Sequence, residues 1–455
     1  MAETARPVVL TTVTTAIGLF SFMLVGVQAL SGFGLFAGLA SLLACVMTFV
    51  VTAVILSRVS ADAVVPPAFL GQRRLINRVA SFCVALTGRH GGKVILLTLL
   101  LGLVSLYGVQ RLKLSHDTLD WIPSSWTEIR GLELIDHHFG SASSYELVVD
   151  SGAPGGVRSV AFVSVLADLA RDLRQGDAAE VFSLAQSVQD YLADISRAMD
   201  GEVLDYRNYT NGDELVWRDM RFFQIGMPEA FASMVSRDYR YARMTVGLSR
   251  EQAMESERAR EVLDAVVARH GGAEVVEVTG FLPMLRQTLD IIHAGAILSF
   301  VVSLLMIFLL LLLFFRNFSV AMLTMLPNVV PIVFVLALLA VAGVRLDMIT
   351  IMIGSLIIGV IVDDTIHFLS NFRHAQQAGQ SVPESCEHAL QTSGHAMLAT
   401  SLVLMGAFAV LGMSQLGLLS LFALISVTIL ALGLAADFLL MPAIMQWLQS
   451  GRLRV

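Results

Sequence analysis

At positions 359 to 368 the chain reads Gly-Val-Ile-Val-Asp-Asp-Thr-Ile-His-Phe, within an apolar run that begins near Met348. A carboxylate at membrane depth costs at least about 2.5–3.5 kcal/mol on insertion scales, so Asp363 and Asp364 require a polar interior face. On a helix with 3.6 residues per turn, His367 lies one turn beyond both aspartates, and the three side chains can share one protein-facing stripe. The segment predicts a membrane helix whose ionisable side chains face the interior of a helical bundle.

Two neighbouring carboxyl groups in such a place suit proton transfer. A low-dielectric surrounding and a like charge next door both favour the protonated form, so the pair can take up and release a proton near neutral pH. We therefore predict a proton relay of Asp363, Asp364 and His367. The alternative is that the aspartates only hold helices together, although Ser or Thr would do so at lower cost. Supporting positions are Thr365, Thr400, Ser401 and Asp437, and for Thr400 and Ser401 plain packing is the competing interpretation.

The composition of the whole chain agrees with a membrane protein. Of its 455 residues 56% are hydrophobic and only 15% are charged, which is too apolar for a chain whose whole surface meets water. A helix needs about 20 apolar residues to cross the hydrocarbon core of a bilayer. The sequence predicts about eight such spans, near 8–27, 33–56, 93–110, 290–315, 319–343, 348–371, 396–413 and 417–447.

The remaining charges lie mostly in one block. Residues 112–288 hold 17 Lys and Arg against 28 Asp and Glu, and we interpret them as an extracytoplasmic domain. Basic residues at the opposite ends of the spans mark the cytoplasmic side, which places both termini there. We predict a transmembrane hairpin (1–57), a cytoplasmic linker (58–92), a transmembrane helix (93–111), the external domain (112–288), a five-helix bundle (289–449) and a cytoplasmic tail (450–455). A signal peptide ending near Ala29 is the alternative for the first run.

The chain contains an internal repeat. The stretch from Arg6 to Thr12 shares its spacing with the stretch from His395 to Ser401, and each opens an apolar span. A second span follows each stretch and opens with Gly-Leu, at Gly34 and at Gly417. Such repeats are typical of duplicated transporters, and they predict that residues 1–57 end an earlier unit that is mostly missing from this chain.

Residues 112–288 alternate between strand-like and helix-like patterns, typical of a split βαβ, ferredoxin-like α+β domain. We predict strands at Tyr145–Asp150, Tyr241–Leu248 and Glu274–Thr279, and helices at Val157–Arg174, Ala185–Met199 and Arg250–Arg269. The histidines of this block, at positions 116, 137, 138 and 270, lack metal-ligand spacing and are expected at the surface. No metal, cofactor or nucleic-acid partner is predicted, and Cys45, Cys83 and Cys386 predict no disulfide in the external domain.

The segment Gly359–Phe368 resembles the fourth-helix motif in the C-terminal half of RND (resistance-nodulation-cell division) superfamily permeases, in their MMPL-like branch. The resemblance covers nearly the whole chain. It extends to His116–Pro123, to Val278-Thr279-Gly280, and to Phe315–Phe318 followed by Leu326–Pro331. It implies a bacterial inner-membrane exporter of hydrophobic compounds or lipids, driven by proton flux through Asp363, Asp364 and His367. Family members usually carry two six-helix units, so the chain is expected to pair with itself or with a separately encoded N-terminal half.

Two other functions compete with proton-driven export. An intramembrane aspartyl protease needs two carboxylates that face each other from different helices, whereas Asp363 and Asp364 are neighbours on one helix, so we predict no enzyme. A non-transporting sterol-sensing, lipid-sensing or assembly subunit would share the helix plan. Replacing Asp363 separates the two, because a sensor keeps ligand binding while a pump stops moving substrate.

Overall fold

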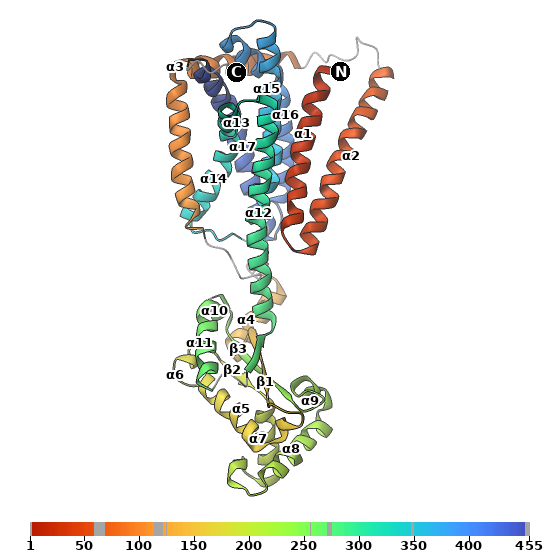
Figure 1. Cartoon of the computed structure of the whole chain (residues 1–455), viewed down its shortest axis with the longest axis vertical. Coiled ribbons are helices and arrows are strands. Elements are labelled where there is room, and N and C mark those ends of the chain that lie inside the picture. The colour runs from red at the N-terminus through yellow and green to blue at the C-terminus, as the bar shows by residue number, and fades with distance from the viewer. Residues whose placement is uncertain are drawn as a thin grey trace. The chain divides into compact units, whose positions relative to one another are not determined.

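The structure, a computed structural model, describes residues 2–58, 69–112, 122–123, 125–254, 256–270, 275–346 and 350–450. The chain divides into two compact units (Figure 1). Unit 1 comprises Met1–Trp121 and Leu289–Val455, and unit 2 comprises Ile122–Thr288. The predicted start of the external domain, from Lys113 to Trp121 with His116, lies outside the described residues, as do Glu274 and the tail beyond Ser450.

Unit 1 is a helical membrane bundle. The described residues contain eight helices long and apolar enough to span a bilayer, which confirms the predicted number. Its helices are α1 (Ala2–Phe20), α2 (Gln28–Arg58), α3 (Phe69–Val109), α12 (Phe281–Phe315), α13 (Phe318–Thr324), α14 (Leu326–Val341), α15 (Ile353–Gln377), α16 (Val382–Leu411) and α17 (Gly417–Ser450).

Local sequence signals explain where several of these helices start and bend. Asn317 caps α13 by accepting hydrogen bonds from two backbone amides, and Pro327 lies in the first turn of α14, so the predicted span 319–343 consists of two helices. A capping box of Ser381 and Glu384 starts α16 well before the predicted position 396. The predicted linker 58–92 is largely helical, because α3 begins at Phe69 and bends at His90.

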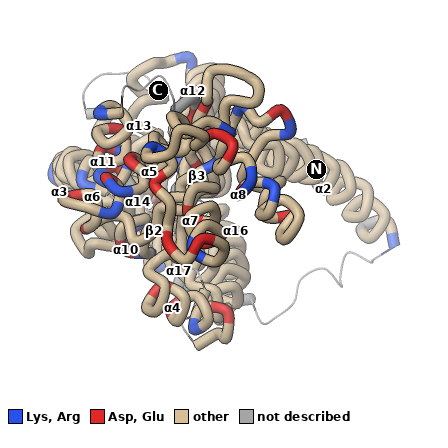
Figure 2. The backbone as a smooth tube through the Cα atoms, turned by 90° about the horizontal axis from the view of Figure 1, so that it is seen from below, with Lys and Arg blue, Asp and Glu red and all other residues tan. Residues whose placement is uncertain are grey.

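The helix that carries the two aspartates is the most enclosed of the spans. In its most apolar stretch 72% of α15 is buried, against 6% of α2. Helices α1, α14, α16 and α17 pack around α15. Helix α2 carries one charged residue, Arg58 at its end, and is otherwise uncharged in Figure 2. An uncharged helix with an exposed apolar surface is suited to lipid, whereas α15 is held in a protein interior.

Unit 2 is an α+β domain. Its sheet consists of β1 (Ser143–Asp150), β2 (Leu184–Gln186), β3 (Tyr241–Leu248) and β4 (Val275–Thr279), in the antiparallel order β2-β3-β1-β4. This antiparallel sheet agrees with the predicted ferredoxin-like α+β class. The helices are α4 (Thr127–Phe139), α5 (Val160–Leu173), α6 (Gly176–Ala179), α7 (Val188–Asp200), α8 (Gly212–Gly226), α9 (Pro228–Met234), α10 (Arg250–Met254) and α11 (Ser256–Arg269).

The structure corrects several predicted elements of unit 2. Ala185 belongs to strand β2 rather than to a helix, because Ser187 and Asp190 form a capping box that starts α7 at Val188. The predicted helix Arg250–Arg269 consists of α10 and α11. Strand β2, with three residues, is too short to show a period, and α4, α8 and α9 were not predicted.

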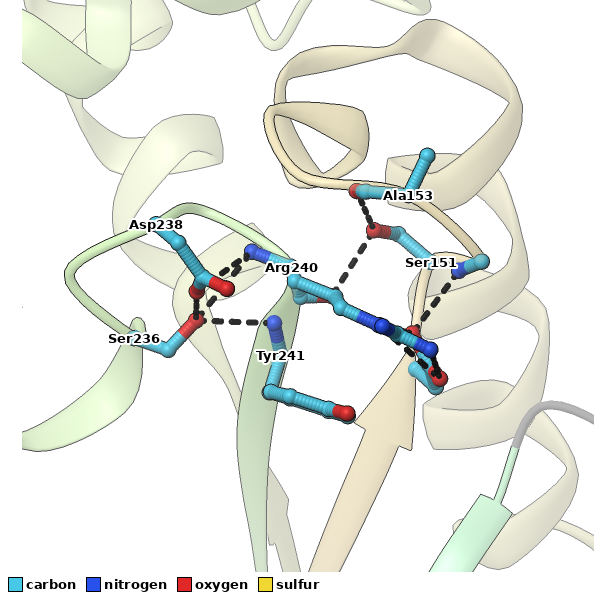
Figure 3. A network of polar contacts seen from close by, with 8 residues as sticks. Ser151, Ala153, Ser236, Asp238, Arg240 and Tyr241 are labelled. Atoms are coloured by element: carbon cyan, nitrogen blue, oxygen red, sulfur yellow. Dashed lines mark hydrogen bonds and ion pairs between the residues drawn. The ribbon is translucent and has the colours of Figure 1, made fainter.

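A polar network joins the end of β1 to the start of β3 (Figure 3). The Arg240 guanidinium donates hydrogen bonds to both oxygens of Asp150, and Ser151 donates to the carbonyl of Arg240 at 2.7 Å. Ser236 accepts hydrogen bonds from the amides of Arg240 and Tyr241. The hydrogen bonds from Arg240 lower the pKa of Asp150, so the stabilisation from this pair is present above the usual carboxyl pKa and is lost as the pH falls through the lowered pKa.

Candidate functional site

The two aspartates of α15 meet different neighbours. Asp364 is 8% exposed, and Ser401 of α16 donates a hydrogen bond of 3.1 Å to its Oδ2 atom. Asp363 lies on the side of α1, where the hydroxyl group of Thr11 is beside its carboxyl group. Nε2 of His367 lies 3.4 Å from Oδ1 of Asp363. The structure thus brings His367 to Asp363, while Asp364 meets α16, and the side chains of Asp363 and His367 are still about one third exposed, at 31% and 28%.

A third carboxyl group lies on the other side of the pair. Asp437 of α17 is fully buried, and Thr365 donates a hydrogen bond of 2.7 Å to its Oδ1 atom. The Thr365 hydroxyl also lies 3.2 Å from Oδ1 of Asn328, whose amide donates to the carbonyl of Thr324. No partner is present for Oδ2 of Asp437 among the described residues. One hydroxyl group thus connects α14, α15 and α17 next to Asp364.

A small cavity opens onto the two aspartates. Its volume is about 20 Å³, and its polar lining comes from Asp363, Asp364, Thr400 and Ser401. A volume of this size admits about one water molecule. Asp437 does not line it. The cavity therefore gives the pair, but not the third carboxyl group, room for a water that could carry a proton.

Close packing of two glycines brings α1 against α15. A Cβ atom on Gly18 would lie 2.9 Å from the carbonyl oxygen of Ser355, and one on Gly359 would lie 3.0 Å from that of Thr14. The Thr15 hydroxyl lies 3.2 Å from the carbonyl oxygen of Gly359. Only glycine allows backbones to approach this closely, which places Thr11 beside Asp363.

The two copies of the internal repeat lie on either side of the aspartates. The two stretches that matched in sequence lie within α1 and α16, and both helices pack against α15. Thr11 lies beside Asp363, and Ser401 donates to Asp364. Thr400, also predicted as a partner, donates to carbonyls of its own helix instead. The two copies therefore flank the aspartates from opposite sides.

A buried cluster of hydroxyl groups lies two turns away on the same face of α15, and sequence reasoning missed it. Ser299 of α12 is hydrogen-bonded to Ser21 at 2.6 Å and donates to Ser355 at 3.1 Å, and all three are at most 4% exposed. Ser303, one turn along α12, is fully buried without a partner in the described chain. We call Ser21, Ser299, Ser303 and Ser355 the serine cluster. Serines are common in membrane helices, so their convergence had no sequence signal.

An apolar cap adjoins the serine cluster. Phe22, Val25, Ile292, Ala296 and Met352 form a separate buried cluster, and each is at most 6% exposed. Phe22 follows Ser21 directly, and Met352 is three residues from Ser355. On α15 the distance from Ser355 to Asp363 is eight residues, or about 12 Å along the axis. The cluster thus lies between the cap and the aspartates.

The described residues contain no group of three or more His, Cys, Asp or Glu side chains that could hold a metal ion. The buried polar groups in the described part of unit 1 are hydroxyls, the carboxyls of Asp364 and Asp437, the amide of Asn328 and the imidazole of His293. Such groups can pass protons between one another. Within the described part of unit 1, the arrangement is suited to proton transfer.

Comparisons with known proteins agree with this architecture. The model of the MMPL family matches residues 146–453. Part of the chain is 26% identical, over 149 residues, to a membrane protein of Methanocaldococcus jannaschii, covering 33% of this chain and 38% of that protein. The fold is similar to the hedgehog release protein Disp from the water bear Hypsibius dujardini, with a TM-score of 0.60 and 15% identity over 97% of this chain and 58% of that one.

A second structural likeness is to SecDF, a translocon-associated membrane protein from Thermus thermophilus. The TM-score is 0.52 at 13% identity, over 99% of this chain and 49% of SecDF. The chain therefore spans about half the length of the solved structures it resembles. With sequence identities of 13% and 15%, the structural similarity shows the fold alone.

Proposed function

The chain belongs to the MMPL family, and from this premise we propose that it is part of a proton-driven exporter of hydrophobic or lipid-like substrates in the bacterial inner membrane. The observation that carries the proposal is the position of Asp363 and Asp364 in α15, enclosed by four helices and open to a cavity with room for one water molecule. Ionisable groups at such depth are costly, and in membrane proteins they usually mark ion pathways.

In the mechanism we propose, Asp363 and Asp364 carry the proton and His367 exchanges it with Asp363. Ser401 hydrogen-bonds Asp364, and a change in the charge of Asp364 alters the strength of this contact between α15 and α16. Thr365 and Asp437 transmit the same change to α17. Proton transfer would thus shift the packing of α15 against its neighbours, and this shift drives a rearrangement of the external domain.

The proposal includes a partner, either a second copy or a separately encoded N-terminal half. The solved structures with this fold are about twice as long. Asp363 and His367 remain about one third exposed, which a second helical unit would cover. Cross-linking in membranes should therefore give a dimer or a heteromeric product; a monomer with full activity would contradict this part of the proposal.

The experiment that tests the function is transport by the complete assembly in vesicles. An imposed pH gradient should drive movement of a fluorescent hydrophobic substrate, and an uncoupler that collapses the gradient should stop it. Movement that is unchanged by the uncoupler would contradict proton coupling. Binding of lipid without any movement would favour the alternative of a sterol- or lipid-sensing subunit.

An enzymatic function is the weaker candidate, and we infer that the chain is not a protease. Asp437 faces α15 from another helix, as a carboxylate dyad would require. However, Asp437 is fully buried and does not line the cavity beside Asp363 and Asp364. A hydrolytic dyad needs a water molecule between both carboxyl groups, so this geometry favours proton transfer.

The orientation in the membrane is a testable part of the proposal. We expect unit 2 to be extracytoplasmic and both termini to be cytoplasmic, because basic residues between the spans, such as Arg58, Arg89 and Arg373, lie on the side of the termini if the spans alternate. Acidic residues predominate in unit 2. An alkaline phosphatase fusion at Asp177 should be active, and one after Val455 should be inactive. The reverse pattern would overturn the proposed orientation.

We further propose that protons reach Asp363 through the serine cluster. Converting Ser299 to Ala removes the hydroxyl group that bonds both Ser21 and Ser355, and should slow proton-driven transport at saturating substrate while leaving substrate affinity unchanged. Ser299→Thr, which keeps the hydroxyl group, should retain more activity. The matched control is Ser426→Ala, a buried serine on α17 that donates only to its own helix. Equal rates for Ser299→Ala and Ser426→Ala would exclude this route.

A further inference from the structure

Helix α3 is longer than a membrane span requires. The helix has 41 residues, which is about 62 Å, twice the hydrocarbon thickness of a bilayer. It bends at His90, and the 19 residues from Gly91 to Val109 are long enough to cross by themselves. We call residues 76–90 the interfacial segment. In Figure 1 α3 reaches the end of unit 1 that carries both chain termini.

One face of the interfacial segment is bound to the bundle. Its buried residues recur at helical spacing, namely Ile76, Ala80, Cys83, Val84 and Thr87. Gln446 of α17 donates hydrogen bonds to the carbonyl of Val84 and to Thr87, and Ser81 donates to Glu387 of α16. These contacts hold the segment across the ends of α16 and α17.

The outward face combines apolar and basic side chains. Val79, Phe82 and Leu86 follow at i, i+3 and i+7 and are 40%, 65% and 36% exposed. Arg78 and Arg89 are exposed beside this stripe, and Lys93 is exposed where the membrane-crossing part begins. The sequence of α3 contains no Asp or Glu, and in the described part of the chain none of these three cations has an ion-pair partner.

From this arrangement we propose that the interfacial segment binds anionic phospholipids of the adjoining leaflet. The apolar stripe inserts among acyl chains, and Arg78, Arg89 and Lys93 contact phosphate and other anionic headgroup oxygens. An amphipathic helix that lies in the interface with cations beside its apolar face is suited to such a surface. The charge excess favours anionic over zwitterionic lipid, and the proposal does not depend on proton transport.

The test measures which lipid lies next to the segment in the full-length protein. Cys45 is replaced by Ala, leaving Cys83 and Cys386, which are buried. Phe82→Cys carries an NBD fluorophore, and Leu103→Cys, at 66% exposure in the membrane-crossing part, is the matched control. The protein is placed in vesicles of phosphatidylcholine and phosphatidylglycerol. Quenching of the NBD fluorescence is compared between phosphatidylglycerol and phosphatidylcholine that carry a nitroxide on the acyl chain.

A single cation near an anionic surface favours anionic lipid about five-fold. We therefore expect at least about five-fold enrichment of phosphatidylglycerol over phosphatidylcholine at position 82, and a ratio near one at position 103. Replacing Arg78, Arg89 and Lys93 by Gln should bring the ratio at position 82 to one. The control variant with Arg78→Lys and Arg89→Lys, which retains the positive charges, should keep the enrichment. If the Gln variant does not fold, 0.5 M salt should abolish the enrichment in the parent. A ratio of one at position 82 at low salt would overturn the proposal.

Discussion

Neutralising Asp363 or Asp364 is expected to reduce proton-driven transport to the background of empty vesicles, while the protein still folds and inserts. Asparagine keeps the size and an acceptor oxygen, so the hydrogen bond from Ser401 to position 364 can remain. It cannot take up and release a proton near neutral pH. Removing a buried charge lowers the cost of insertion, so expression should not fall.

The design of this measurement separates coupling from folding. Asp363→Asn and Asp364→Asn are compared in the same vesicles with Asp290→Asn, an exposed carboxylate of α12 that is outside the candidate site. The control should transport normally. His367→Ala should cause only a partial loss, because its contact with Asp363 is long at 3.4 Å and a water molecule could replace it. Full transport by both Asn variants of the pair would assign them a structural role and favour the lipid-sensing alternative.

Removing Asp219 is expected to have the largest effect on the stability of unit 2. Asp219 is fully buried, accepts a hydrogen bond from the Tyr206 hydroxyl at 2.8 Å, and pairs with Nε of Arg218 at 2.7 Å. Burial and the bond to Asp219 raise the pKa of Tyr206. Asp219→Ala leaves a buried hydroxyl and a guanidinium without this acceptor. The expected loss is about 3 kcal/mol, at the lower end for broken buried pairs because Arg218 is partly exposed.

Hydrogen exchange of the amides of α8 in the full-length protein measures this loss, because it reports the local free energy of opening. Tyr206→Phe should cost about 1 kcal/mol, since it removes one hydrogen bond. Asp194→Ala, which breaks a pair with both side chains exposed, should change the free energy by at most about 0.5 kcal/mol. Equal protection in Asp219→Ala and Asp194→Ala would show that the buried pair contributes no more than a surface pair.

The sequence by itself determined the membrane architecture. Eight apolar runs at the length of a bilayer, and an acidic block with alternating strand and helix patterns, predicted the bundle and the α+β domain that the structure shows. These features are local, since span length and periodicity follow from the neighbours of each residue. Asp363, Asp364 and His367 were recognisable for the same reason, because charge within an apolar run is visible without any fold.

Only the tertiary structure decided what surrounds those residues. It selected Ser401 rather than Thr400 as the partner of Asp364, and it brought Thr365 to Asp437 across 72 residues of chain. It also joined Ser21, Ser299 and Ser355 from three helices. Neighbouring positions on a helix differ by about 100° in direction, so which hydroxyl group faces a carboxyl group depends on how each helix is rotated in the bundle. That rotation is set by packing between distant segments, such as the contact of Gly18 with Gly359, and no local pattern contains it.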